Sequence, residues 1–405
     1  MNDMISCKNI LSVLICSFSI IIVGLSLVSV IFPSLIISNF GLQQISTEPF
    51  ELGSNAITIM IGNFLLFGFG ILYYTKKFPQ SIQDKLRNVF TTDISSKVAI
   101  IVILIILLPY VVLTVPELFI DEYTQATDYQ VFLAAKKIFP FGETTFTEAS
   151  EQNDRYVRMI LLIGSLEIFQ NVKIIPFLGS IALLITTYFF TKEITKKRLA
   201  GIISMLVLIQ SYTFLKFDSY AMYENFWVLF YILSLYLIYK KWYISSISYI
   251  LSIFTKAFTA IFLPLSLVFV YYSKIPSKTK ILLVVSYAIM FCVILSIWSL
   301  DDSIYSDIIR FDLGQILIGF TKLSYQLRFD LLLLVAILPL TIALILKSRQ
   351  RIDIATSVLF LMTGSIFLGP IVEMFSDFYV ILPYRFIPTI VFFSVGVGIL
   401  FNTKK

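Results

Sequence analysis

The sequence predicts an all-α, polytopic membrane protein, and three observations support this fold class. Of the 405 residues, 58% are hydrophobic and 14% are charged, whereas a typical soluble domain carries roughly 25% charged residues. The apolar residues fall in runs close to the ~20 residues that a helix needs to cross a hydrocarbon core of ~30 Å. Lysine and arginine collect between alternate runs, as they do in the cytoplasmic loops of membrane proteins. We therefore expect one transmembrane helical bundle and no separate soluble domain.

The charge, histidine and cysteine content excludes several other classes of protein. The net charge of +6 follows from the basic bias of cytoplasmic loops, so no nucleic-acid partner is expected. The chain has no histidine, which excludes histidine-based catalysis and histidine metal ligands. Its three cysteines, Cys7, Cys16 and Cys292, are scattered and offer neither a disulfide framework nor the spacing of a metal site.

About twelve runs qualify as membrane spans by length and composition. The first run, from Ile10, is longer than the apolar part of a signal peptide and no small-residue cleavage site follows it, so we expect it to be retained. The run at 242–255 is short for a crossing, but the charges of the later loops keep their alternation only if it crosses. The predicted spans are 10–37, 55–75, 98–116, 174–191, 199–215, 224–239, 242–255, 257–273, 281–299, 330–346, 353–372 and 380–401.

The basic loops predict the orientation of the chain. With the N-terminus in the cytoplasm, every even-numbered span returns the chain to the cytoplasm, and the loops that follow these spans are basic. The opposite loops are acidic or mixed, as Glu48 and Glu51 illustrate before the second span. We expect a multi-pass protein of the cell membrane with both termini in the cytoplasm and any active site on the extracytoplasmic side. The residues that set this orientation are Lys76, Lys77, Lys85, Arg87, Lys97, Lys192, Lys196, Lys197, Arg198, Lys240, Lys241, Lys274, Lys278, Lys280, Lys347, Arg349, Arg351, Lys404 and Lys405.

The longest segment between spans, 117–173, lies on the outer face in this topology. It contains two amphipathic stretches, 128–139 and 155–169, whose apolar residues recur at helical spacing. We expect two surface helices there, which either form a roof over a site or simply pack on the bundle. The chain then divides into residues 1–97, an N-terminal transmembrane hairpin with a basic cytoplasmic loop, and residues 98–405, the main bundle.

Carboxylates at the mouth of the third span are the first candidates for catalysis. Asp121 and Glu122 are adjacent and follow the end of that span by a few residues. A partly desolvated carboxylate can act as a general base toward an acceptor hydroxyl, although acidic residues at an outer interface are often only solvated. Asp128 follows in the same loop, and Arg155 fits either phosphate binding or the polar side of an interfacial helix.

Three ionisable residues near the ends of later spans are candidates for substrate binding. Glu224 lies in an outer turn, Lys256 follows a short span, and Arg385 stands where the last span begins. Because such residues are costly in a membrane, they serve a site or extend to the interface. Two cations and several carboxylates on one face would suit a lipid-linked phosphate, since cations hold the phosphate and a carboxylate handles the incoming hydroxyl.

This arrangement resembles the multi-spanning GT-C glycosyltransferases, which include protein mannosyltransferases and aminoarabinose transferases. The resemblance covers roughly residues 98–400 and is carried by short motifs. They are the acidic pair that ends a span, the long outer loop, the basic turn with Lys197 and Arg198, the acidic outer turn, the segment FTKAFTAIFLPL at 254–265 and the segment PYRFIPTI at 383–390.

The resemblance implies a sugar donor of the polyprenyl- or dolichyl-phosphate type, used on the extracytoplasmic face, usually with inversion. Asp121 matches the loop acid that acts as base or positions the acceptor, and Glu122 is its neighbour and possible substitute. Lys256 and Arg385 would hold the donor phosphate, with Glu224 lining the sugar pocket. The chain lacks the large soluble domain of the protein mannosyltransferases, so a lipid or a glycan is as suitable an acceptor as a protein. Some relatives use a divalent cation, which here would need carboxylate ligands.

Two other classes of function fit a polytopic bundle. A transporter or lipid flippase would show two related halves and ionisable residues near the midplane, whereas the charges here gather at the outer ends of the spans. A non-catalytic assembly subunit would leave the outer carboxylates and cations without a common site.

Overall fold

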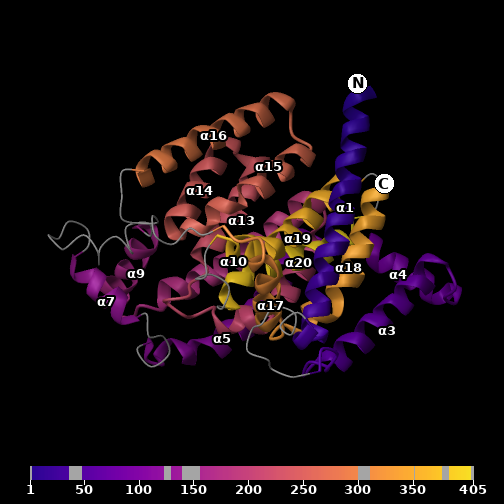
Figure 1. The fold of residues 1–405 in the computed structure, drawn as a ribbon, viewed down its shortest axis with the longest axis horizontal. Coiled ribbons are helices and arrows are strands. Elements are labelled where there is room, and N and C mark those ends of the chain that lie inside the picture. The colour runs from indigo at the N-terminus through magenta and orange to yellow at the C-terminus, as the bar shows by residue number, and fades with distance from the viewer. Residues whose placement is uncertain are drawn as a thin grey trace.

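The computed structural model describes residues 2–35, 48–122, 129–138, 156–299, 311–350, 352–375 and 383–402. Over these residues the protein is all-α, with 17 α-helices, three short 3-10 helices and no strand. The predicted all-α class is therefore confirmed for the described part of the chain. Figure 1 shows the helices packed into one bundle, with α7 and α9 at one end of the view and α3 and α4 at the other.

Seven helices are long and apolar enough to cross a membrane, which points to a multi-pass membrane protein. Five further apolar helices are shorter, and each of the twelve predicted spans coincides with one of these seven or five. The seven candidates are Ile10–Ile31, Ala56–Tyr74, Ser96–Phe119, Ile174–Thr195, Ser277–Ile294, Leu331–Arg349 and Asp353–Glu373. The shorter ones are Arg198–Ile209, Phe226–Lys240, Trp242–Thr255, Ala257–Tyr272 and Pro383–Ile399.

Some boundaries differ from the sequence prediction. The run at 199–215 divides into α11 (Arg198–Ile209) and α12 (Tyr212–Lys216), because the Ser211 hydroxyl accepts a hydrogen bond from Phe214 N at 3.0 Å and so starts a new helix. Two helices, α4 (Gln80–Thr91) and α17 (Gln315–Leu327), were not predicted. Both mix polar and apolar residues, so they lack the continuous apolar run by which spans are recognised.

The N-terminal helices pack against the C-terminal part of the bundle. Helix α1 (Asn2–Ile31) contacts α17, α18 (Leu331–Arg349) and α19 (Asp353–Glu373), and α3 (Ala56–Tyr74) contacts α18. Polar side chains pair inside these interfaces, as where the Ser19 and Thr363 hydroxyls lie 3.0 Å apart. Such pairs satisfy groups that would be costly to leave alone in an apolar interior.

The central helices enclose the core. Helix α10 (Ile174–Thr195) packs against α11 and α13 (Phe226–Lys240), and α20 (Ile387–Ile399) packs against α11 and α19. Helices α14 (Trp242–Thr255), α15 (Leu263–Tyr272) and α16 (Ser277–Ser299) complete the bundle. By contrast α5 (Ser96–Thr114) buries only Ala99, Tyr110 and Thr114, so most of its apolar surface is left to contact lipid.

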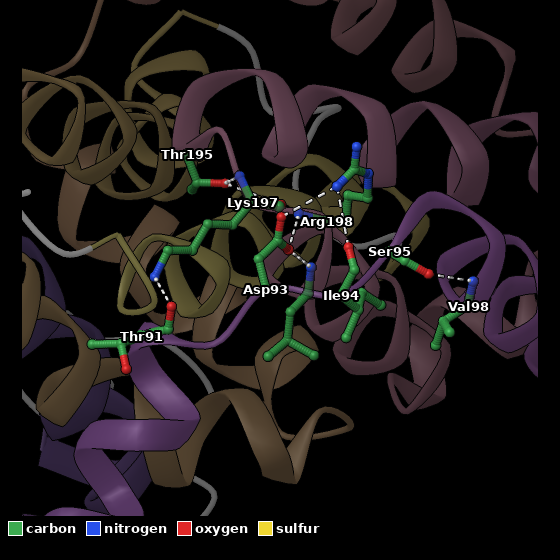
Figure 2. A network of polar contacts seen from close by, with 9 residues as sticks. Thr91, Asp93, Ile94, Ser95, Val98, Thr195, Lys197 and Arg198 are labelled. Atoms are coloured by element: carbon green, nitrogen blue, oxygen red, sulfur yellow. Dashed lines mark hydrogen bonds and ion pairs between the residues drawn. The ribbon is translucent and has the colours of Figure 1, made fainter.

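Contacts between helix ends sort these ends into two groups. One group, which we call the basic end, joins the segments that precede α5, connect α10 to α11, and end α18 and α20. There Lys197 Nζ donates to Phe90 O at 2.7 Å, and Lys347 Nζ donates to Asn402 O at 2.9 Å. Figure 2 shows how Asp93 accepts from the backbone N–H of Arg198 at 2.8 Å, which caps the start of α11.

The opposite group, which we call the site end, joins the other ends of the same helices. The Thr114 hydroxyl, at the end of α5, donates to Asp218 Oδ2 at 3.3 Å, just before α13. The Ser211 hydroxyl donates to Asp330 Oδ1 at 2.7 Å, at the start of α18.

The two surface helices that the sequence predicts are present as α7 (Tyr129–Ile138) and α9 (Tyr156–Phe169). Phe132 of α7 and Met159 and Leu162 of α9 form a small apolar cluster with Met222 and Phe226. This cluster is separate from the main core, and it seats both helices against the segment that precedes α13.

Close packing at Gly319 leads to a stability prediction. A Cβ at this position would lie 2.7 Å from Pro370 Cα of α19, so Gly319→Ala should force α17 away from α19 and cost about 1–3 kcal/mol. The matched control is Gly68→Ala in α3, where nothing lies within 4 Å of an added Cβ. We expect thermal unfolding of the purified protein in detergent to show a lower Tm for the first variant alone. Equal Tm values would contradict the α17–α19 packing.

Candidate functional site

The centre of the candidate site is the non-helical segment 217–225, between α12 and α13. Between its ends, which bond to α12 and α13, its backbone polar groups lie outside any helix, so side chains help to satisfy them. The Ser180 hydroxyl of α10 donates to Asp218 O at 2.8 Å, and the Asn225 amide donates to Ser180 Oγ at 2.9 Å. One serine of α10 therefore fixes both ends of this segment.

Glu122 holds the middle of the segment. Its Oε1 accepts the backbone N–H groups of Ala221 at 3.1 Å and Met222 at 3.0 Å, and its Oε2 lies 3.4 Å from Lys173 Nζ. Glu122 is 3% exposed and Lys173 is 1% exposed. Burial raises the pKa of the Glu122 carboxyl, while Met222 N–H and the Lys173 ammonium oppose that shift. Lys173 also donates to Glu117 O at 3.2 Å, so it ties the start of α10 to the end of α5.

Glu224 is held by an arginine of α9, the second surface helix. Arg158 Nε of α9 lies 3.1 Å from Glu224 Oε2, and its terminal nitrogen donates to Met222 O at 2.8 Å. Both side chains are almost fully buried. Because a buried carboxylate needs a partner, the pair with Arg158 satisfies Glu224 and fastens α9 to the segment.

Lys256 and Arg385 lie together around one aromatic ring. Lys256 Nζ is 3.9 Å from the centroid of the Tyr384 ring and 5.4 Å from that of Trp227. Arg385 Nε approaches Tyr384 Oη at 3.5 Å, and the Tyr223 ring stacks on the Tyr384 ring at 4.8 Å. Cations that lie over aromatic faces are stabilised by the ring electrons, so the aromatic rings hold a half-buried lysine in place.

The electrostatic surroundings of Lys256 leave its charge adjustable. The pKa of Lys256 is lowered to about 8: burial lowers it most, Tyr384 and Glu224 oppose the shift, and the charge of Arg385 adds to it. The ammonium is therefore mostly charged at neutral pH and loses its proton in mildly alkaline solution. These interactions also show that Glu224, Lys256 and Arg385 share one electrostatic environment.

Asp218 is a buried acid that the sequence analysis missed. It is 1% exposed, and Ser219, its neighbour, donates to Glu117 Oε2 at 3.1 Å. Burial raises the pKa of Asp218 to about 7; the hydroxyl of Thr114 lowers it and the charge of Glu117 raises it. Its position in a polar turn between two apolar runs was the available signal, but the turn also holds Glu224, and no local pattern distinguishes a buried acid there from a solvated one.

The structure brings most of the predicted site residues to the site end. Glu122, Glu224, Lys256 and Arg385 gather around segment 217–225 and Tyr384. Asp121 is exposed beside Glu122, after the short 3-10 helix Val115–Phe119. Burial raises the pKa of the nearby Tyr129 of α7, and the charges of both acids add to this shift. The predictions for Asp128 and Arg155 lie outside the described residues.

The donor set of the described residues bears on metal binding. Within the described ranges, no three or more aspartate, glutamate or cysteine side chains gather where they could hold a metal ion. The arrangement instead joins two cations, an aromatic group and several carboxylates. Such a set can bind a phosphate and accept a proton.

The buried pair of Glu122 and Lys173 leads to a second prediction. Glu122→Gln leaves a buried ammonium without its charged partner, so we expect it to destabilise the protein by about 3–5 kcal/mol. The matched control is Glu167→Gln, which breaks the more exposed pair between Lys136 and Glu167 and should cost at most about 1 kcal/mol. Tm values of the purified variants measure both effects. A larger loss in the control would mean that the Glu122–Lys173 pair does not hold the segment.

Comparisons of the chain with protein-family models, with curated proteins and with solved structures found no match.

Proposed function

We propose that the protein is a membrane glycosyltransferase that moves a sugar from a polyprenyl- or dolichyl-phosphate donor to an acceptor hydroxyl. The observation that carries this proposal is the convergence of Glu122, Glu224, Lys256 and Arg385, from four distant parts of the chain, around one segment at the site end. Two cations beside several carboxylates match a reaction in which a phosphate leaves and a hydroxyl attacks.

We further propose that the chain crosses the cell membrane twelve times, through the seven long apolar helices and the five shorter ones. The basic end, with Lys197, Arg198, Lys240 and Lys347, would face the cytoplasm together with both termini. The site end would then face the extracytoplasmic side, where the outer segments are acidic or mixed.

In the proposed reaction, the ammonium of Lys256 and the guanidinium of Arg385 bind the donor phosphate. The acceptor oxygen attacks the anomeric carbon from the side opposite the phosphate, so the configuration inverts. The bond between that carbon and the phosphate oxygen breaks, and the phosphate takes the electron pair. The acceptor's proton passes to Asp121. The products are the glycosylated acceptor and the polyprenyl or dolichyl phosphate.

The two neighbouring acids are suited to different roles. Glu122 already binds two backbone N–H groups and an ammonium and is buried, so it serves to position the loop. Asp121 is exposed at the site end, where an acceptor hydroxyl can reach it. We therefore assign the base to Asp121 and a positioning role to Glu122. The acceptor is a lipid, a glycan or a protein.

Asp121→Asn tests the role of the base. An amide cannot take a proton from the hydroxyl, so transfer should fall by about 10²–10⁴-fold. The free energy of unfolding should stay within about 0.5 kcal/mol of the parent's, because the side chain is exposed.

To measure transfer, the protein would be reconstituted with a radiolabelled polyprenyl-phosphate hexose and cell-envelope lipid extract. Glu51→Gln, an exposed acid before α3, is the matched control. Full activity of Asp121→Asn would refute the assignment, and donor transport without transfer in the parent would favour a flippase.

Lys256 gives a prediction about pH. Since the pKa of Lys256 is lowered to about 8, the charge that would bind the donor phosphate is present below that pH and is lost above it. Donor affinity should therefore fall as pH rises from 7 to 9.5, approaching about tenfold per unit, the limit for one linked proton. Lys256→Arg keeps its charge throughout and should remove this dependence. Donor binding, measured by equilibrium partition of the donor between labelled and unlabelled vesicles, would test this prediction. The same dependence of donor affinity on pH in the parent and in Lys256→Arg would contradict it.

A further inference from the structure

Helix α4 (Gln80–Thr91) belongs neither to the core nor to the candidate site, and it contains no buried residue. Its apolar residues Ile82, Leu86, Val89 and Phe90 recur at intervals of three and four, so they share one side of the helix. Ile82 is 43% exposed and Val89 is 52% exposed. An apolar face of this kind on a helix at the end of a membrane span is typical of a helix that lies in the lipid interface.

Both ends of α4 are fixed to the bundle, so its orientation is set. At its end, Phe90 packs on Tyr73 at 5.7 Å and on Phe401 at 5.0 Å. Lys197 donates to the carbonyl oxygen of Phe90 and, as Figure 2 shows, to that of Thr91, so it caps the helix from the α10–α11 turn. Before its start, Phe78 packs on Phe69 of α3 at 5.0 Å. Ile82 and Val89, between these anchors, remain open.

The surface around α4 indicates what covers this face. The last turns of α3 expose Phe69, Ile71 and Leu72, so the open face of α4 continues an apolar surface that belongs to a candidate membrane span. At 100° per residue, Lys85 and Arg87 flank the apolar side of α4, one on each edge. Lys76, Lys77 and Lys97 add three exposed cations around the helix. Long basic side chains at the edges of an apolar face bind lipid phosphates while the face enters the acyl region.

We propose that α4 is an interfacial anchor whose apolar face inserts into the lipid leaflet at the basic end and whose flanking cations bind anionic phospholipid headgroups. Its partner is an anionic lipid surface. Within residues 76–97, the acidic residues that accompany these five cations are Asp84 and Asp93. Asp93 already accepts a hydrogen bond from the backbone at the start of α11 and pairs with the Arg198 side chain. The basic excess therefore remains available for lipid phosphates. This inference depends on the membrane assignment and is independent of the reaction at the site end.

A depth measurement with the full chain tests the insertion. In a background with Cys7, Cys16 and Cys292 replaced, a fluorescent probe would be attached at Val89→Cys or at Thr91→Cys. Thr91 lies two residues further, about 200° around the helix and therefore on its opposite side. In phosphatidylcholine vesicles that contain phosphatidylglycerol, lipids with a nitroxide on the acyl chain should quench the Val89 probe several-fold more than the Thr91 probe.

The charge dependence provides the second arm of the experiment. Omission of phosphatidylglycerol, or Lys85→Gln combined with Arg87→Gln, should reduce quenching of the Val89 probe. The matched control, Lys274→Gln with Lys278→Gln, removes two exposed cations just before and within the first turn of α16 and should leave the quenching of the Val89 probe unchanged. Equal quenching at Val89 and Thr91 would overturn the insertion. Protection of the Val89 probe from both lipid nitroxide and aqueous iodide would overturn it as well, since a second copy of the chain would then cover α4. Quenching of the Val89 probe that does not depend on phosphatidylglycerol would overturn the anionic-lipid assignment.

Discussion

The absence of water from the hydrocarbon core is the constraint on which this structure depends. Backbone N–H and C=O groups inside a bilayer must bond within their own segment, which leaves helices as the form for an open chain. The same constraint moves charges to the ends of helices, where water or a partner is present. The division of the chain into a basic end, with Lys197 and Lys347, and a site end, with Glu122 and Glu224, is the direct consequence.

At the site end the constraint acts a second time, because several charges there are buried. Three of these charged groups have a specific partner: Lys173 for Glu122, Arg158 for Glu224, and the ring of Tyr384 for the half-buried Lys256. Such pairs contribute little net stability compared with apolar packing, but removing one partner is costly. The segment 217–225 is consequently fixed by charges whose first role is to satisfy one another. Arg385 stands beside the same ring, so a ligand phosphate would enter a site that is already ordered.

Apolar runs were sufficient to predict the twelve apolar helices of the bundle, and helical spacing predicted the two surface helices, because the cost of burying polar groups leaves a strong signal in the sequence. Helix α4 escaped prediction since its apolar residues occupy one side and its average composition is polar. The partner of Glu224 could not be predicted either. Arg158 is 66 positions earlier in the sequence, and pairing across such a distance depends on how α9 packs, which no local pattern encodes. Asp218 was missed for the same reason, since its burial follows from α5 and α10 closing over the turn.

Helix α5 shows how the two ends of the bundle act together. It contributes few residues to the core, so packing alone would hold it weakly. At its start, Asp93 binds Arg198 and caps α11; beyond its end, Glu122 pairs with Lys173 at the start of α10. Since α10 is itself enclosed by α11 and α13, these two contacts fasten an otherwise lipid-exposed helix at both ends to a rigid one. The position of Asp121, the proposed base, is therefore set by ion pairs at opposite ends of the bundle as well as by its own loop.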